Sequence, residues 1–182
     1  MSNSRKKVIV RRFSGDTLPG YLAHASIVRN NAIDLLDLGG RMLSLPLNDI
    51  KTVCYVRDFN LADTQNPERL TRRAFLARPR SEGLWLRLTF RSGDLFEGLA
   101  PTDHSLIDAL IDDAGLFLIP PDTRSNTQRL YVPRAAITEL QLLAVITTPS
   151  RRAVATDRPA KDTLQLQDEL FHVPLDPDSR PN

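Results

Sequence analysis

The sequence predicts a mainly β protein made of two tandem small five-stranded barrels. Three observations lead to this fold class: short alternating apolar runs, glycine-containing turns between them, and an internal repeat of both. The pattern S-G-D-x-x-x-G occurs in "SGDTLPG" (residues 14–20) and again in "SGDLFEG" (residues 92–98). Gly-Asp is typical of a tight hairpin turn, and the second glycine lets the next strand bend sharply. Each copy is therefore expected to begin with a β-hairpin.

A second pair of similar segments follows the first in the same order. "LSLPLNDIKTVCYV" (residues 43–56) matches "LYVPRAAITELQLL" (residues 130–143). The first pair is 78 residues apart (14 to 92) and the second 87 (43 to 130), so the second copy carries nine additional residues. Part of this surplus is the polar stretch "PPDTRSNTQR" (residues 120–129), whose counterpart is only "GGR" (residues 39–41). The stretch predicts an elongated hairpin loop.

The expected elements follow from this repeat. Strands are predicted over residues 7–12, 17–23, 32–38, 41–45, 50–56, 85–91, 95–100, 116–119, 129–132 and 137–146, with helical turns over 103–115. The predicted domains are a first barrel (1–56), an Arg-rich linker (57–83) with a short helix starting near Pro67, a second barrel with the long loop (84–146), and a largely disordered tail (147–182). Within the tail, residues 163–175 are the one candidate for an added strand or a docking peptide.

Composition limits the possible functions. Lys and Arg number 24 and Asp and Glu 22, so the net charge is only +2 and offers no overall attraction for nucleic acid or an acidic membrane. The single cysteine, Cys54, excludes an intrachain disulfide. The start "MSNSRKKVIVRRF" lacks the apolar region of a secretion signal, and no apolar run approaches the roughly 20 residues of a membrane span. We therefore predict a cytoplasmic protein.

Two turns within the second pair of repeated segments resemble the last turn of the Sm-like (Lsm) small barrel. "LPLNDI" (residues 45–50) and "VPRAAI" (residues 132–137) are similar to its last turn in length and apolar ends. The resemblance implies a strongly bent five-stranded sheet. Both segments lack the Arg-Gly centre that helps the family hold RNA. The chain as a whole also looks like an uncharacterised bacterial protein family.

The leading functional hypothesis is a non-catalytic binding or assembly module. It would act through a protein partner or through self-association by strand edges, as open strand edges invite pairing. The candidate ligand-binding residues belong to the long loop and its flanks: Arg124, Asn126, Gln128, Arg129 and Arg134. The alternative interpretation of this loop is a polar hairpin held by Asx turns.

A second resemblance gives an alternative function. The pair Arg69-x-x-x-Arg73, followed by Asp103-x-Ser105, is similar to the PilZ family, which implies binding of cyclic di-GMP. Guanidinium groups pair well with phosphate and with the guanine edge. The family's glycine is replaced here by Asp108. The alternative function that the two resemblances imply is a regulatory protein that binds cyclic di-GMP or RNA.

The sequence offers no catalytic or metal-binding motif. His24, His104 and His172 are far apart, and HExxH and CxxC patterns are missing, so no metal and no cofactor are predicted. In Asp103-His104-Ser105 the side chains are too close in sequence to form a triad, and the segment is better explained as a helix N-cap. Cys54 lies in the strand pattern "VCYV" and is expected to be a buried, inert thiol. We therefore predict that the protein is not an enzyme.

Overall fold

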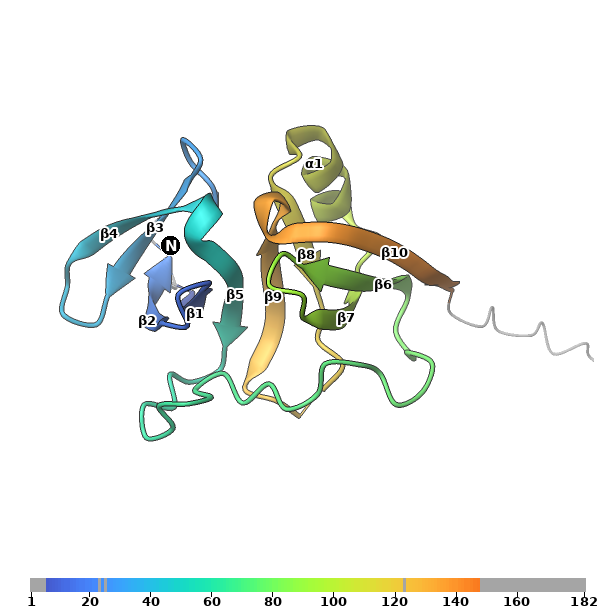
Figure 1. Ribbon diagram of the computed structural model, residues 1–182, viewed down its shortest axis with the longest axis horizontal. Helices are drawn as coiled ribbons and strands as arrows, with labels where there is room; N and C mark the ends of the chain where they lie inside the picture. Colours follow the sequence, from blue (N-terminus) through green and yellow to red (C-terminus); the bar gives the residue numbers. More distant parts are fainter. Residues whose placement is uncertain (1–5, 23, 25, 123, 148–182) are drawn as a thin grey trace, which may run out of the picture. The chain divides into compact units, whose positions relative to one another are not determined.

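The described part of the computed structural model consists of residues 6–22, 24, 26–122 and 124–147. It contains ten strands, and all lie within two residues of the predicted ranges, so the prediction of a mainly β protein is confirmed (Figure 1). The strands are β1 (Lys7–Arg12), β2 (Thr17–Leu22), β3 (Ala32–Asp37), β4 (Met42–Pro46), β5 (Ile50–Val56), β6 (Gly83–Phe90), β7 (Leu95–Ala100), β8 (Gly115–Leu118), β9 (Thr127–Pro133) and β10 (Ile137–Ile146). No helix of this part is long and apolar enough to cross a bilayer.

The strands form two antiparallel sheets. The larger sheet has the order β4-β3-β2-β1-β5-β9-β8, and the smaller has the order β10-β6-β7. Strand β5 pairs with β1 on one side and with β9 on the other, with Val53 opposite Tyr131 and Cys54 opposite Leu130. Because β9 takes the free edge of β5, the first five strands do not close on themselves. The sheets therefore stay open, and the larger one runs through both halves of the chain; this topology does not confirm the two five-stranded barrels expected from the sequence.

The wall formed by β1, β5 and β9 separates two apolar cores. Side chains alternate across a strand, so each of these strands contributes to both cores. On β1, Ile9 faces one core and Val8 and Val10 face the other. On β9, Leu130 and Val132 face the core shared with β6 and β7, whereas Tyr131 joins the core of the first half. A strand buried on both faces explains the continuous apolar runs in the sequence.

The second half repeats the strand pairings of the first. Strand β1 pairs with β2 and β5, and β6 pairs in the same way with β7 and β10. Strands β3 and β4 pair with each other, as do β8 and β9. The contact of β2 with β3 is reduced in the second half to a single bridge, between Leu99 and Ile119. A 3-10 turn precedes the last strand of each half, η1 (Leu47–Asp49) and η2 (Arg134–Ala136).

Two insertions account for the longer second copy. The connection from β7 to β8 has fourteen residues (101–114) against nine between β2 and β3 (23–31), and it contains the predicted helical turns as α1 (His104–Asp112). The hairpin loop between β8 and β9 has eight residues (119–126) against four between β3 and β4 (38–41). The predicted elongation of this loop is therefore observed, but it supplies only part of the surplus.

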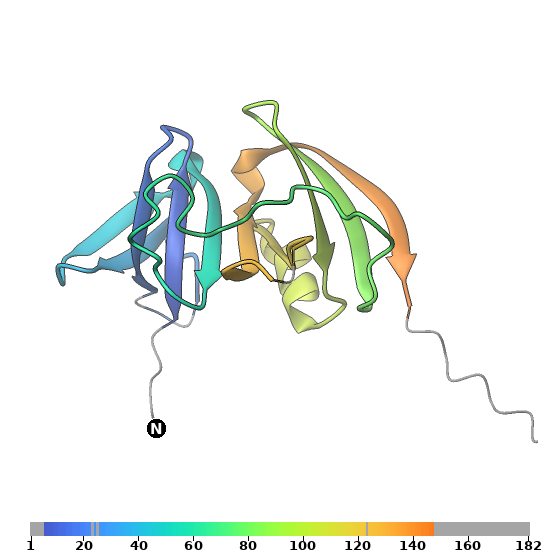
Figure 2. The same cartoon turned by 90° about the horizontal axis from the view of Figure 1, so that it is seen from below.

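The predicted linker helix is wrong, because residues 57–82 contain no helix. The left-handed φ of 48° at Arg69 interrupts any helical turn there. The linker's backbone bonds with distant segments instead: Glu97 N–H donates to Arg73 O (2.7 Å). Figure 2 shows this segment crossing from the first half to the second along one side of the sheets. Tertiary partners here satisfy the backbone better than a short helix of polar residues.

The second glycine of each S-G-D-x-x-x-G motif lies where a neighbour comes very close. A Cβ added to Gly20 would be 2.5 Å from the backbone oxygen of Leu36, and one added to Gly98 would be 2.9 Å from Cβ of Leu118. Both glycines are needed because another segment packs against the bare backbone at these points.

Candidate functional site

The predicted ligand-binding residues of the long loop have internal partners. Asn126 is half-buried, and its Nδ2 donates to Asp58 O (2.6 Å) and Pro67 O (2.9 Å) while its Oδ1 accepts from Asp58 N (3.1 Å). Arg124 is exposed, and its backbone N–H donates to Asp122 Oδ1 (3.0 Å) in an Asx-type turn. Asn126 therefore clamps the linker to the loop.

The remaining predicted residues flank this loop. The Arg129 guanidinium stacks on the Phe117 ring at 4.0 Å, and Gln128 is exposed. Arg134 donates from Nη1 to Ile137 O (3.2 Å), and its Nε lies 3.6 Å from Asp113. These residues lie on β9 and η2 and do not converge with Asn126 on one described cavity.

The four residues of the alternative nucleotide site are divided between two regions. Arg69 donates to Asn60 Oδ1 (2.7 Å) and Arg73 to Asp94 Oδ1 (3.0 Å), both from the linker. The Leu106 N–H donates to the backbone oxygen of Asp103 at the start of α1 (3.1 Å), and the side chain of Ser105 lies outside the described part. Figure 1 shows α1 at the opposite side of the sheets from the linker.

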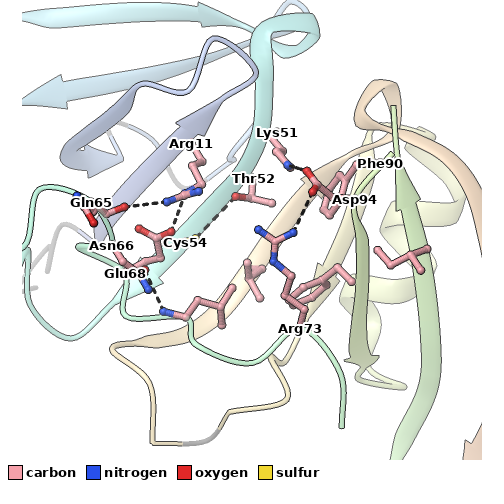
Figure 3. Close-up of a pocket in the computed structure, with 14 residues that line it drawn as sticks. Arg11, Lys51, Thr52, Cys54, Gln65, Asn66, Glu68, Arg73, Phe90 and Asp94 are labelled. Carbon is pink, nitrogen blue, oxygen red and sulfur yellow. Dashed lines mark hydrogen bonds and ion pairs between the residues drawn. The ribbon is translucent and has the colours of Figure 1, made fainter. Parts of the chain in front are cut away.

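A cavity of about 320 Å³ lies between the two halves, under the linker (Figure 3). The residues that line it come from β1, β5, the linker, the β6–β7 hairpin and β9; they include Arg11, Lys51, Thr52, Cys54, Gln65, Glu68, Leu70, Arg73, Phe90, Asp94, Phe96 and Leu130. Figure 3 shows two charged clusters on opposite sides, with Thr52 and Cys54 between them. The cavity thus has two charged ends, and apolar side chains make up part of the rest of its lining.

The first cluster is built around Glu68, whose side chain is only 4% exposed. Its Oε1 lies 2.6 Å from Nε of Arg11, and Nη2 of Arg11 donates to Gln65 O (3.2 Å). Among the described residues, no group donates a hydrogen bond to the buried Oε2 of Glu68. A buried carboxylate oxygen that accepts no hydrogen bond carries a desolvation penalty. A bound group that donated a hydrogen bond to this oxygen would remove that penalty.

The second cluster is built around Asp94. Its carboxylate accepts from the Lys51 ammonium, from Ser92 Oγ (2.9 Å) and from Arg73 Nη1 (3.0 Å). The hydrogen bonds from Lys51, Ser92 and Arg73 hold the pKa of Asp94 well below its usual range. The Arg73 side chain is 60% exposed, so this end of the cavity opens to solvent.

Cys54 lies at the floor of the cavity as the predicted inert thiol. Burial raises the pKa of Cys54 to about 12, so the thiolate that would react or bind metal is not formed near neutral pH. Among the described residues, no three His, Cys, Asp or Glu side chains gather as a metal site.

Among the residues that line this cavity, the sequence predicted only Arg73 as a binding residue; it assigned Cys54 to a buried strand and Asp94 to a hairpin turn. Arg11, Lys51, Glu68 and Asp94 belong to four separate segments, and no local pattern marks them as a group.

The free edge of the smaller sheet is a second candidate site. Strand β10 pairs with β6 on one side, and no described strand pairs with its other side. Leu140 lies opposite Leu88 and Leu142 opposite Leu86, so both point toward the core side of the sheet. Nevertheless Leu140 is 51% and Leu142 is 54% exposed, whereas Leu86 and Leu88 are buried. The described residues therefore cover these two side chains of β10 only in part.

The other end of the strand order is also open. Strand β4 pairs only with β3 among the described strands, and its Met42 is 57% exposed. Figures 1 and 2 both show β4 and β10 on opposite outer sides of the described strands.

Comparison with known proteins places the chain but assigns no activity. No curated protein and no solved structure matches it significantly. Residues 4–144 match the model of one family, which spans both halves of the described strands. The chain therefore belongs to the DUF6982 family, a family of unknown function.

Proposed function

We propose that this protein is a non-catalytic assembly module that joins copies of itself by strand-edge pairing. In this proposal each half is one copy of a five-stranded Sm-like unit, which the repeated pairings of β1–β5 and β6–β10 support. The observation that carries the proposal is the β5–β9 pair, in which the last strand of one unit pairs with the fourth strand of the other. The two unused counterparts of these strands are β10 and β4.

The observed pair gives the register for the proposed one. The repeat relates residues 53–55 of β5 to 140–142 of β10, and residues 129–131 of β9 to 42–44 of β4. Tyr55 lies opposite Arg129 in the observed pair, so the same register places Leu142 opposite Met42 of the next molecule. These are two exposed apolar side chains, and each would bury the other on association. A contact between two different edges is head-to-tail and can repeat from molecule to molecule.

The test uses charged residues, which block strand edges in natural proteins. We expect wild-type protein to form oligomers larger than dimers as its concentration rises in sedimentation velocity, and L142K and Met42→Lys each to remain monomeric. Mixing the two variants restores one intact β10 and one intact β4, so the mixture should form a complex of two molecules and stop there.

The control is Ile107→Lys, which places the same charge on a 55% exposed apolar residue of α1 and should assemble like wild type. A wild-type protein that stays monomeric at every concentration would contradict the proposal. A mixture that fails to form the two-molecule complex would equally reject the head-to-tail pairing.

A further inference from the structure

The cavity between the halves has the size of a small-molecule site. Ligand pockets span about 300–1,000 Å³ and combine apolar walls with a few placed polar groups. The volume of about 320 Å³ lies at the small end of this range. It is distinct from the β10 and β4 edges that carry the assembly proposal, since neither strand contributes a lining residue.

The buried end of the cavity offers an acceptor beside a donor. Oε2 of Glu68 is buried without a donor among the described residues, and the neighbouring Arg11 guanidinium carries five N–H donors, two of which face Glu68 and Gln65. A ligand group with an N–H next to a carbonyl or ring nitrogen fits this pair. Amides and the hydrogen-bonding edges of nucleobases have this arrangement.

The open end of the cavity is suited to an anion. Lys51 and Arg73 share the single carboxylate of Asp94, which leaves one net positive charge at this end. Arg73 has further donors toward solvent, and guanidinium forks bind phosphate oxygens well.

Apolar side chains form part of the cavity wall. They are Leu70, Phe90, Phe96 and Leu130, and the Phe90 ring lies beside the Lys51 ammonium at 5.1 Å. A ligand that reaches both ends must therefore carry a flat or apolar body between its donor edge and its anionic group.

We propose that the cavity binds a nucleoside monophosphate, with the base edge on Glu68 and Arg11 and the phosphate on Lys51 and Arg73. This ligand class has the donor–acceptor edge, the flat body and the anionic group in the required order. The proposal uses neither Asp103 nor Ser105, so it differs from the site that the PilZ resemblance implies.

The test is isothermal titration calorimetry of the full-length chain with guanosine, uridine and adenosine 5′-monophosphate, with the corresponding nucleosides, and with inorganic phosphate. We expect at least one nucleotide to bind about tenfold or more tightly than its nucleoside and than phosphate, since both ends contribute. Arg73→Ala should weaken the nucleotide about tenfold and leave the nucleoside unchanged. E68Q should weaken both, because a charge-assisted hydrogen bond is replaced by a neutral one.

The matched control is Arg124→Ala, which removes an exposed arginine outside the cavity and should bind like wild type. Absence of heat with all three nucleotides overturns the proposal. Binding that survives both cavity variants, or that Arg124→Ala reduces instead, also overturns it. Arg73 is largely exposed, so its variant keeps the test decisive should E68Q fail to fold.

Discussion

Strands β5 and β10 follow the same local sequence in the two halves: a proline, a 3-10 turn and then an isoleucine. Strand β5 is buried along most of its length, whereas residues 138–142 of β10 are all exposed. The difference lies in what stands beside them, since β9 covers the free edge of β5 and no described strand covers that of β10. Identical local patterns therefore reach different degrees of burial through their neighbours.

The largest effect should come from shortening a buried side chain on β9, the strand that pairs with the free edge of β5. Leu130 of β9 is 1% exposed, and its counterpart in β4 is the half-buried Leu43. We expect Leu130→Ala to lower the free energy of unfolding by about 2–5 kcal/mol and Leu43→Ala by about 1 kcal/mol. Urea denaturation followed by circular dichroism measures both. Equal losses would show that β4 is as well covered as β9.

A second matched pair compares β5 and β10 directly. Val53 is fully buried, and its counterpart is Leu140. Val53→Ala should cost about 2 kcal/mol of unfolding free energy, and Leu140→Ala within about 0.5 kcal/mol when the protein is kept dilute. A large loss for Leu140→Ala in dilute protein would mean that something covers β10 within the same chain.

The two close-approach glycines sharpen the comparison further. An alanine Cβ at position 20 would lie 2.5 Å from the Leu36 backbone oxygen, whereas one at position 98 would lie 2.9 Å from the Leu118 Cβ, which is a less severe overlap. We expect both changes to destabilise the protein by about 1–3 kcal/mol, with the greater loss for Gly20→Ala. Thermal unfolding of both variants gives the order, and the reverse order would contradict the packing described for β2.

The smallest predicted effect is a pH dependence of stability that comes from a carboxylate present only in the second half. Burial raises the pKa of Glu97, but hydrogen bonds from Arg87, the Phe75 N–H and Trp85 outweigh it and lower this pKa overall. The first half has Pro19 at the equivalent position. A carboxylate whose pKa is lower in the folded state stabilises the protein at pH values above its unfolded pKa of about 4.3. This stabilisation is lost as the pH falls through the folded-state pKa.

Unfolding free energy should therefore fall between about pH 5 and pH 3 in wild type and fall less steeply in Glu97→Gln. The exposed Asp108 of α1 provides the control variant Asp108→Asn, which should follow the wild-type curve. Parallel curves for wild type and Glu97→Gln would remove Glu97 as a source of acid sensitivity.

Sequence alone located every described strand, because period-two alternation and glycine turns are local signals that each strand carries by itself. It also located α1 from its apolar spacing and the long β8–β9 loop from its polar insertion. The repeat of two motifs in the same order is reflected in the pairing of β6 with β7 and β10 and of β8 with β9, as of their counterparts in the first half. These features depend on residues close together in the chain.

Tertiary structure decided the rest. Nothing local says that β5 pairs with β9 rather than closing its own sheet, because an edge accepts any strand that reaches it in register. The linker does not form the predicted helix, because groups on the distant residues Glu97, Asn126 and Thr127 donate hydrogen bonds to its backbone carbonyl oxygens. The cavity joins Arg11, Glu68 and Asp94 from segments far apart in the chain, and only folding brings such side chains within reach of one another.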